Sequence, residues 1–174
     1  MRSVDAGAVV VLCGYGGERT SAGLYRIDSV LEEEMPEYIL IMEGTNDIQA
    51  NIGRREIFYN LRGMVNKAKE YGSIPVIGTL PPRNECDYMN DWTEDLNRDY
   101  IRPFAREEKV LLADQWKCFH DTGHWEDYID EGHQHPNTAG YKLMAECWFV
   151  ALVEDSPPEN LTASVGDWNA YLRW

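Results

Sequence analysis

The stretch Tyr38-Ile39-Leu40-Ile41-Met42-Glu43, followed at once by Gly44-Thr45-Asn46-Asp47, decides the fold of this chain. Its apolar, β-branched first part predicts a buried strand, and the glycine and side-chain amide after it predict a turn. In open parallel sheets, ligands bind beyond the carboxyl ends of the strands. Asn46 therefore stands where a side-chain amide can donate a hydrogen bond to a developing negative charge. The competing interpretation is that Asn46 and Asp47 only shape a turn or cap the next helix.

Outward from this stretch, apolar strand-like runs alternate with amphipathic helical patterns. Strands are expected at 9–13, 38–43, 74–79 and 110–113, helices at 21–34, 52–71, 93–109 and 137–153, and a polar loop at 83–92. This alternation predicts a three-layer α/β/α fold with a parallel, flavodoxin-like sheet covered on both faces. The composition changes after residue 153, so a first domain at 1–153 and a separate segment at 154–174 are expected.

The composition excludes several classes of function. The chain has 174 residues and a formal net charge of -14, and such an acidic surface repels nucleic acid and anionic membranes. No apolar run approaches the roughly 20 residues of a membrane span, and no signal peptide is recognised at the start. Cys13 and Cys147 are expected as buried thiols, whereas a disulfide involving Cys86 and Cys118 stays open because connectivity does not follow from sequence.

All four histidines lie between 120 and 135, shortly before the expected last helix. A histidine fixed before a helix, with carboxylates a few residues upstream, has the chemistry of an oriented general base. His133 and His135 with Asp127 and Asp130 also offer ligands for zinc or manganese, although no further spaced ligand cluster supports a metal. Solvated loop histidines without a role are the third interpretation. Asn137 or Thr138 suits the N-cap of the helix that follows.

Taken together, three segments over roughly residues 8–153 resemble the SGNH/GDSL hydrolases. Gly44-Thr45-Asn46-Asp47 resembles the family's Gly-x-Asn-Asp block, and the segment from Gly16 to Leu24 resembles its second block, with Gly17 at the oxyanion glycine. The segment His135-Pro136-Asn137-Thr138-Ala139-Gly140-Tyr141 resembles the closing block. The resemblance implies an SGNH-like fold and a carboxylic ester hydrolase that needs no cofactor and no metal. Gly17 and Asn46 would be oxyanion donors and His135 the base.

The chain departs from the family pattern at the acid. The family's aspartate usually stands three residues before the catalytic histidine, but Gly132 occupies that place before His135. Asp130 has this spacing only to His133. Either the loop carries an insertion and Asp130 or Glu131 still reaches His135, or His133 is the base. We favour His135, with Asp130 as its acid.

The chain also lacks the family's Gly-Asp-Ser block, and none of its serines stands where the nucleophile belongs. The segment 154–174 resembles the opening of a fibronectin type III domain. Both features predict an N-terminally incomplete hydrolase domain, a fragment without esterase activity, from an exported parent protein. In the family fold the missing strand lies between 8–13 and 38–43, so these two strands would pair directly or leave backbone groups unpaired.

The expected substrate of the parent protein is a small-molecule or carbohydrate ester, such as an acetylated sugar. Tyr88, Trp92 and Trp125 near the expected mouth can stack on sugars, although core packing accounts for them equally well. Arg83 should rim the same crevice, and pairing with Glu85 or Asp87 is its simpler role. The alternative function is a non-catalytic carbohydrate- or protein-binding module, which the missing serine favours.

Overall fold

The computed structural model describes residues 9–132 and 134–154. The helices and strands follow in the order α1 (Thr20–Glu34), β1 (Tyr38–Ile41), α2 (Thr45–Gln49), α3 (Arg54–Glu70), β2 (Ile74–Gly78), α4 (Asp87–Leu96), the π-helix η1 (Asn97–Ile101), α5 (Arg102–Glu107), β3 (Leu111–Ala113), α6 (Gln115–His120), the 3-10 helix η2 (Trp125–Tyr128) and α7 (Thr138–Glu154). Among these residues, no helix is both long and apolar enough to cross a bilayer.

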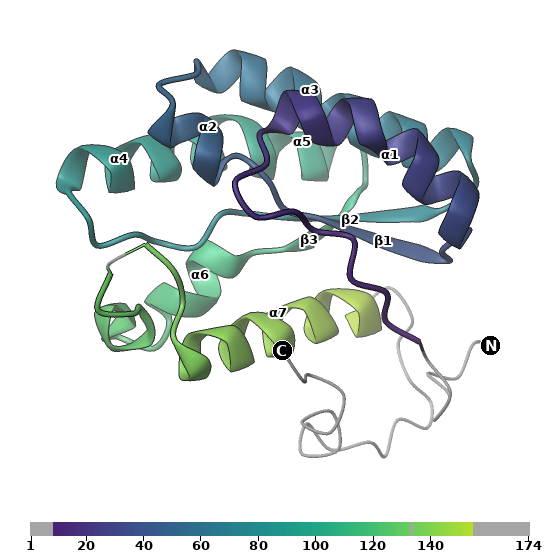
Figure 1. Cartoon of the computed structure of the whole chain (residues 1–174). Coiled ribbons are helices and arrows are strands. Elements are labelled where there is room, and N and C mark those ends of the chain that lie inside the picture. Colours follow the sequence, from purple (N-terminus) through teal and green to yellow (C-terminus); the bar gives the residue numbers. More distant parts are fainter. Residues whose placement is uncertain (1–8, 133, 155–174) are drawn as a thin grey trace.

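The sheet has the order β1-β2-β3, and both strand pairs are parallel. Tyr38 lies opposite Ile74, and Val76 lies opposite Leu111, so the three strands run in register toward one carboxyl edge. Figure 1 shows α1, α3 and α5 on one face of the sheet and α6 and α7 on the other. The predicted α/β class with a parallel sheet between two helical layers is confirmed.

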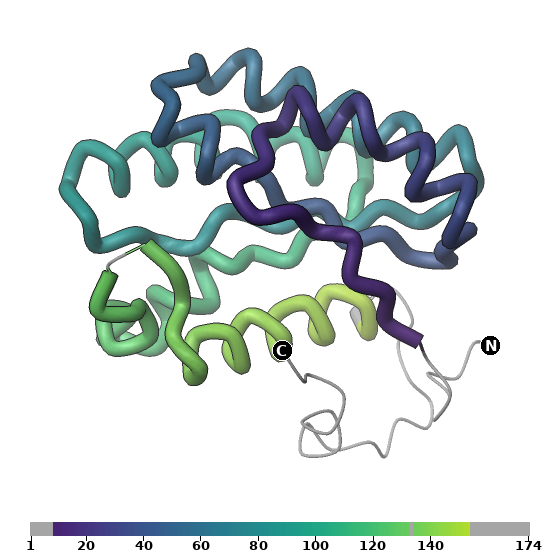
Figure 2. The backbone as a smooth tube through the Cα atoms, in the orientation of Figure 1, coloured from purple at the N-terminus to yellow at the C-terminus, as the bar shows by residue number. Residues whose placement is uncertain are grey.

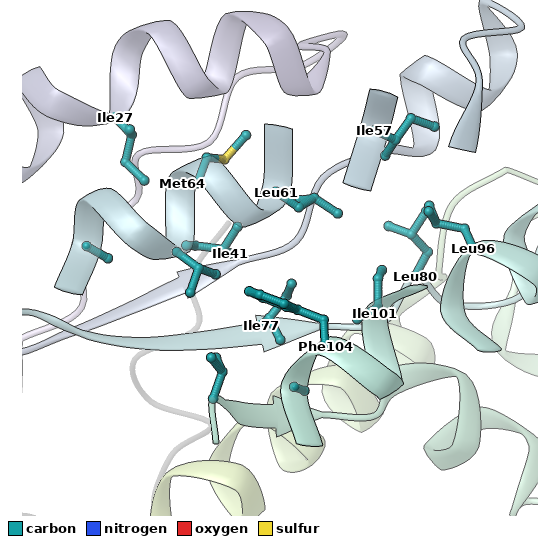
Figure 3. Close-up of a cluster of buried hydrophobic side chains, with 14 of the residues drawn as sticks. Ile27, Ile41, Ile57, Leu61, Met64, Ile77, Leu80, Leu96, Ile101 and Phe104 are labelled. Atoms are coloured by element: carbon teal, nitrogen blue, oxygen red, sulfur yellow. The ribbon is translucent and has the colours of Figure 1, made fainter. Parts of the chain in front are cut away.

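The main core lies between the sheet and α3. The apolar face predicted for the long helix is buried throughout, and Ile57, Leu61 and Met64 each expose 2% or less of their surface. Figure 3 shows Leu61 near Ile41 of the sheet, and Ile57 on the side of Leu80 and Leu96. Because burial of such side chains stabilises a fold by roughly 2 kcal/mol each, this layer fixes how α3 sits on the strands.

The predicted strand at 9–13 is wrong for the structure as described. Residues 9–15 form no helix or strand, and Val9 and Leu12 expose 85% and 70% of their surface. A strand is stable only when a neighbour satisfies its backbone groups. Within residues 9–132 and 134–154 no strand pairs with this segment or with the outer edge of β1. The segment 9–13 and the strand at 38–43 were expected either to pair directly or to leave backbone groups unpaired, and the structure shows the second outcome.

The polar loop predicted at 83–92 is wrong in its second half. Helix α4 begins at Asp87, because Met89, Trp92 and Leu96 recur at helical spacing and pack against the main core. The segment expected as one helix over 93–109 divides into the end of α4, the π-helix η1 and α5. The short helix α2 was also not predicted, because its five residues directly follow Gly44 and were interpreted as part of the turn.

The cysteines differ from the expectation as well. Cys118 of α6 is joined to Cys147 of α7 by a disulfide, with 6.4 Å between the two Cα atoms, so Cys147 is not a buried thiol. Cys13 and the exposed Cys86 are free. The disulfide connects the two helices that flank the histidine-rich segment. The fibronectin-like segment predicted after residue 153 lies, from residue 155 onward, outside the described residues.

Candidate active site

Gly44 shapes the turn at the carboxyl end of β1. Its φ of +130° lies in a region that side chains other than glycine rarely adopt. A Cβ atom here would also lie 3.1 Å from Cγ2 of Ile57 and 3.3 Å from Cδ1 of Leu80. A glycine is therefore required, and it brings Asn46 and Asp47 into the first turn of α2 at the carboxyl edge of the sheet (Figure 1).

Asp47 is buried, with 1% of its surface exposed, and it binds the start of α1 rather than the start of its own helix. Its Oδ2 accepts from the backbone N–H of Thr20 at 2.9 Å, and its Oδ1 accepts from the Thr20 hydroxyl at 2.6 Å. Asn60 of α3 donates to the same hydroxyl at 3.0 Å. The N-cap residue of α1, Arg19, makes no side-chain cap bond, so Asp47 supplies the acceptor that this helix end needs.

Asn46 holds the loop that precedes α1. Its Nδ2 donates to the carbonyl oxygen of Glu18 at 2.8 Å, which brings Asn46 beside Gly17. Gly17 has a φ of +78°, and no atom lies within 4 Å of the position that a Cβ would take. A primary amide carries two N–H donors, so this bond leaves one of them for another acceptor. The structure thus brings together two of the residues predicted as site residues.

A charged cluster lies next to this loop and was not predicted from sequence. Glu18 accepts from Nε and Nη2 of Arg26 at 3.0 and 2.6 Å, and the Arg26 guanidinium lies 4.8 Å from the centre of the Tyr15 ring. Glu43 lies against Gly23 of α1, where a Cβ would approach its Oε2 to 2.3 Å. The sequence did contain a signal for this carboxyl, because an acidic residue directly follows the apolar run of β1.

Burial raises the pKa of the Glu43 carboxyl from 4.5 to about 7, and the nearby charge of Glu18 adds to the rise while Arg26 opposes it. Since the folded-state pKa lies above the unfolded one, the folded protein binds more protons between these values. The stability contributed by this group is therefore present below pH 4.5 and is lost as the pH rises through 7. Partial solvation limits the cost to about 1–2 kcal/mol.

We expect Glu43→Gln to stabilise the protein by about 1–2 kcal/mol at pH 8, because a neutral amide replaces a carboxylate that must ionise in a poorly solvated place. It should also flatten the dependence of stability on pH between 5 and 8. Urea unfolding across this pH range measures both effects. Glu33→Gln, at an exposed glutamate of α1, is the control. Equal slopes of stability against pH for Glu43→Gln and the unaltered protein would refute the expectation.

The segment that carries His135 is fixed by Asn137. Its Oδ1 accepts from the N–H groups of Ala139 and Gly140 at 2.9 and 3.1 Å, which confirms the predicted N-cap of α7. Its Nδ2 donates to the carbonyls of Asp127 and Ile129 at 2.8 and 3.2 Å. The Asn137 side chain therefore binds the backbone before His135 and the start of α7 after it, and this fixes the position of the His135 backbone.

Asp130 and His135 are brought together, but through the main chain. The N–H of Asp130 donates to the carbonyl oxygen of His135 at 2.8 Å, and Asp130 Oδ1 accepts from the N–H groups of Gln134 and His135 at 3.3 Å each. Among the described residues the imidazole of His135, which is exposed, donates no hydrogen bond to Asp130. His133, the alternative base, lies outside the described residues.

The loop after β2 borders the same edge. Arg83 is buried, with 3% of its surface exposed; its Nη1 donates to the Thr45 carbonyl at 3.2 Å, and its Nη2 forms an ion pair with Glu85. The predicted pairing of Arg83 with Glu85 is confirmed. The rings of Tyr88 and Trp92 lie 5.8 Å apart on α4, and the Arg54 guanidinium lies 4.7 Å from the Trp92 ring.

The metal site considered for His133, His135, Asp127 and Asp130 includes His133, which lies outside the described residues. Over residues 9–132 and 134–154, no three histidine, cysteine or acidic side chains lie close enough to hold a metal ion together.

The comparisons with known proteins agree with this architecture. A model of the GDSL-like lipase/acylhydrolase family matches residues 2–143. The chain is similar to Esterase TesA of Pseudomonas aeruginosa, with 29% identity over 104 residues. This alignment covers 59% of the chain and 50% of TesA, so the chain spans about half the length of this curated relative.

Solved structures show the same fold at lower identity. A lipolytic protein of the G-D-S-L family from Veillonella parvula superimposes with a TM-score of 0.68 and 20% identity, over 77% of this chain and 74% of that one. Axe2, an acetylxylan esterase from Geobacillus stearothermophilus, superimposes with a TM-score of 0.69 and 20% identity, over 78% and 68% of the two chains.

Proposed function

Because this chain belongs to the GDSL-like lipase/acylhydrolase family, we propose that it carries the oxyanion-binding and general-base parts of a serine ester hydrolase. The observation that carries the proposal is the hydrogen bond from Asn46 Nδ2 to the Glu18 carbonyl. It brings a side-chain amide and the Gly17 loop to one point at the carboxyl edge of the sheet. A side-chain amide and a glycine N–H from adjoining loops are the kinds of neutral donor that stabilise an oxyanion.

In the proposed reaction, a serine hydroxyl attacks the ester carbonyl while His135 accepts the hydroxyl proton. The carbonyl oxygen becomes the oxyanion, which receives hydrogen bonds from the Gly17 N–H, from the remaining N–H of Asn46 and from the N–H of the serine. His135 then gives its proton to the leaving alcohol, and water hydrolyses the acyl-enzyme by the same steps. Asp130 orients the imidazole once its carboxylate turns from the backbone toward the ring.

We place the nucleophilic serine in a Gly-Asp-Ser segment upstream of this chain. Three serines of the described residues belong to the fold itself. Ser21 and Ser29 lie in α1, and the Ser73 hydroxyl donates to the Pro36 carbonyl at 2.7 Å. The unpaired outer edge of β1 leaves room for the strand that would precede such a serine. In this account the chain of 174 residues is an inactive fragment of an active parent.

The proposed substrate is an acetyl or other short carboxylic ester of a carbohydrate. One relative by fold is named an acetylxylan esterase, and another relative is named an esterase. The exposed Tyr88 beside Trp92 offers an aromatic surface for a sugar ring. We further propose that the parent is exported, which fits a polymeric carbohydrate substrate.

A non-catalytic binding module is the second candidate. The observation that favours it is the lack of a Gly-Asp-Ser block in the chain. The reading frame upstream separates the two candidates, because a Gly-Asp-Ser about 30 residues before Gly17, enough for a strand and a helix, supports the enzyme. A native start at Met1 supports the binding module.

In the protein extended upstream to include its serine, we expect Asn46→Ala to lower kcat by about 10²–10³-fold with little change in KM, because the amide acts on the oxyanion of the transition state. Steady-state hydrolysis of p-nitrophenyl acetate measures the loss. Asn51→Ala, which removes an amide just beyond α2, is the matched control and should retain activity. Equal rates for the Asn46→Ala variant and the unaltered protein would remove Asn46 from the mechanism.

A further inference from the structure

Helix α2, which carries Asn46, depends on the rest of the protein for its conformation. It has five residues and begins after Gly44, which has no side chain to cap it. Helices shorter than about 12 residues are marginal in water unless tertiary contacts support them. Asp47 supplies one such contact, to α1. Figure 2 shows that the turn into α2 and the loop after β2 leave the sheet at the same end, so this loop can supply others.

Arg83 of the loop after β2 binds the peptide group that joins Thr45 to Asn46. Its Nη1 donates to the Thr45 carbonyl oxygen at 3.2 Å, and this oxygen lies in the same rigid peptide plane as the backbone nitrogen of Asn46. Arg83 is buried, and a hydrogen bond away from water is strengthened by the low local dielectric. Rotation of this peptide plane therefore requires that a buried hydrogen bond break.

Glu85 connects the same guanidinium to the other end of α2. Its Oε2 forms an ion pair with Arg83 Nη2, and its Oε1 accepts from Nε2 of Gln49, the last residue of α2, at 3.4 Å. The backbone N–H of Arg83 donates to Oδ1 of Asn90 at 3.0 Å, which ties the loop to α4. The Arg83–Glu85 pair thus contacts the first and the last residue of α2 from a loop that is itself fixed.

Stability alone gives little reason for this pair. Burial of two charges costs solvation free energy, which offsets much of their attraction. Within the described residues, Nε of Arg83 is also buried without a hydrogen-bond partner. A guanidinium does offer donors at fixed angles in one plane, so its contacts define a geometry more narrowly than those of a lysine would.

We propose that the Arg83–Glu85 pair positions Asn46 to bind the oxyanion. This inference rests on the function proposed above. One N–H of the Asn46 amide is used by the Glu18 carbonyl, and the backbone of α2 determines where the other N–H points. Arg83 and Glu85 are positioning residues, which act through Asn46 and not on the substrate. Small displacements of a reacting or stabilising group can cost as much as about 100-fold in rate.

Hydrogen exchange of the 174-residue chain tests whether the pair holds α2. We expect Arg83→Met to make the amides of Ile48 and Ala50, which close the turns of α2, exchange at least about tenfold faster relative to the amides of α3. The comparison with α3 removes any loss of global stability. Arg102→Met is the matched control, because Arg102 forms a comparable, partly buried pair with Asp114 after β3; it should leave the ratio unchanged.

Kinetics of the upstream-extended protein test whether the pair acts through Asn46. We expect Arg83→Met to lower kcat by about 10–100-fold with little change in KM, and Arg102→Met to change kcat by less than about twofold. In the Asn46→Ala background, Arg83→Met should lower kcat by less than about twofold more, because the group that it positions is already absent.

Two results overturn the inference and leave the role of Asn46 intact: unchanged exchange of α2 in Arg83→Met, or an equal loss of kcat from Arg83→Met with and without the Asn46 amide. A third result, an unchanged kcat for Asn46→Ala alone, removes the proposed function and this inference with it. The exchange and the kinetics therefore distinguish the failure of one from the failure of the other.

Discussion

Asp47→Ala is expected to lower the free energy of unfolding by about 3–4 kcal/mol, which makes it the most destabilising single change in the region of the candidate site. The substitution leaves the buried N–H and hydroxyl of Thr20 without their acceptor, and each buried polar group that loses its partner costs about 1–3 kcal/mol. It also removes a negative charge from the start of α1. The expected loss of stability comes from the two hydrogen bonds by which Asp47 joins the turn after β1 to α1.

Urea unfolding at pH 7 measures this effect. Asp47→Asn keeps one carbonyl oxygen in place, so it should cost less, about 1–2 kcal/mol. Asp28→Ala is the control: its ion pair with Lys67 is partly exposed, and its loss should cost less than about 1 kcal/mol. If Asp47→Ala cost no more than Asp28→Ala, the assigned connection between α2 and α1 would be wrong.

His135→Ala is expected to lower kcat by at least about 10⁴-fold in the upstream-extended protein, because the serine then has no group to accept its proton. Steady-state ester hydrolysis measures the loss. His133→Ala is the matched control and should retain most of the activity. The opposite result, a large loss for His133→Ala and a small one for His135→Ala, would assign the base to His133.

The helices α1, α3 and α7 could be predicted from sequence because each is a long periodic pattern bounded by glycine, proline or a cap. The three strands could be predicted because each lies in a short apolar run. The apolar face of α3 and the cap at Asn137 followed from residue spacing alone. The segment 9–13 has the same β-branched composition as a real strand. Its prediction failed because pairing depends on a neighbour, and composition does not tell whether one is present.

The contacts of the residues predicted for the candidate site could not be predicted from sequence. The resemblance placed Gly17, Asn46, Asp130 and His135, and the structure brings them together in two pairs. Spacing could not show that Asp130 binds the backbone around His135 instead of its ring, because the two additional residues between them change the loop geometry. Nor could it show the Cys118–Cys147 disulfide, since pairing depends on how α6 and α7 pack.

The most direct test of the central claim is the hydrolysis of p-nitrophenyl acetate by the 174-residue chain itself, compared with the same chain extended upstream in its own reading frame. A half-site without a nucleophile predicts no turnover above buffer for the short chain, and turnover that depends on His135 for the extended one. Turnover by the short chain that His135→Ala abolishes would show that it already holds its nucleophile, and would contradict the account.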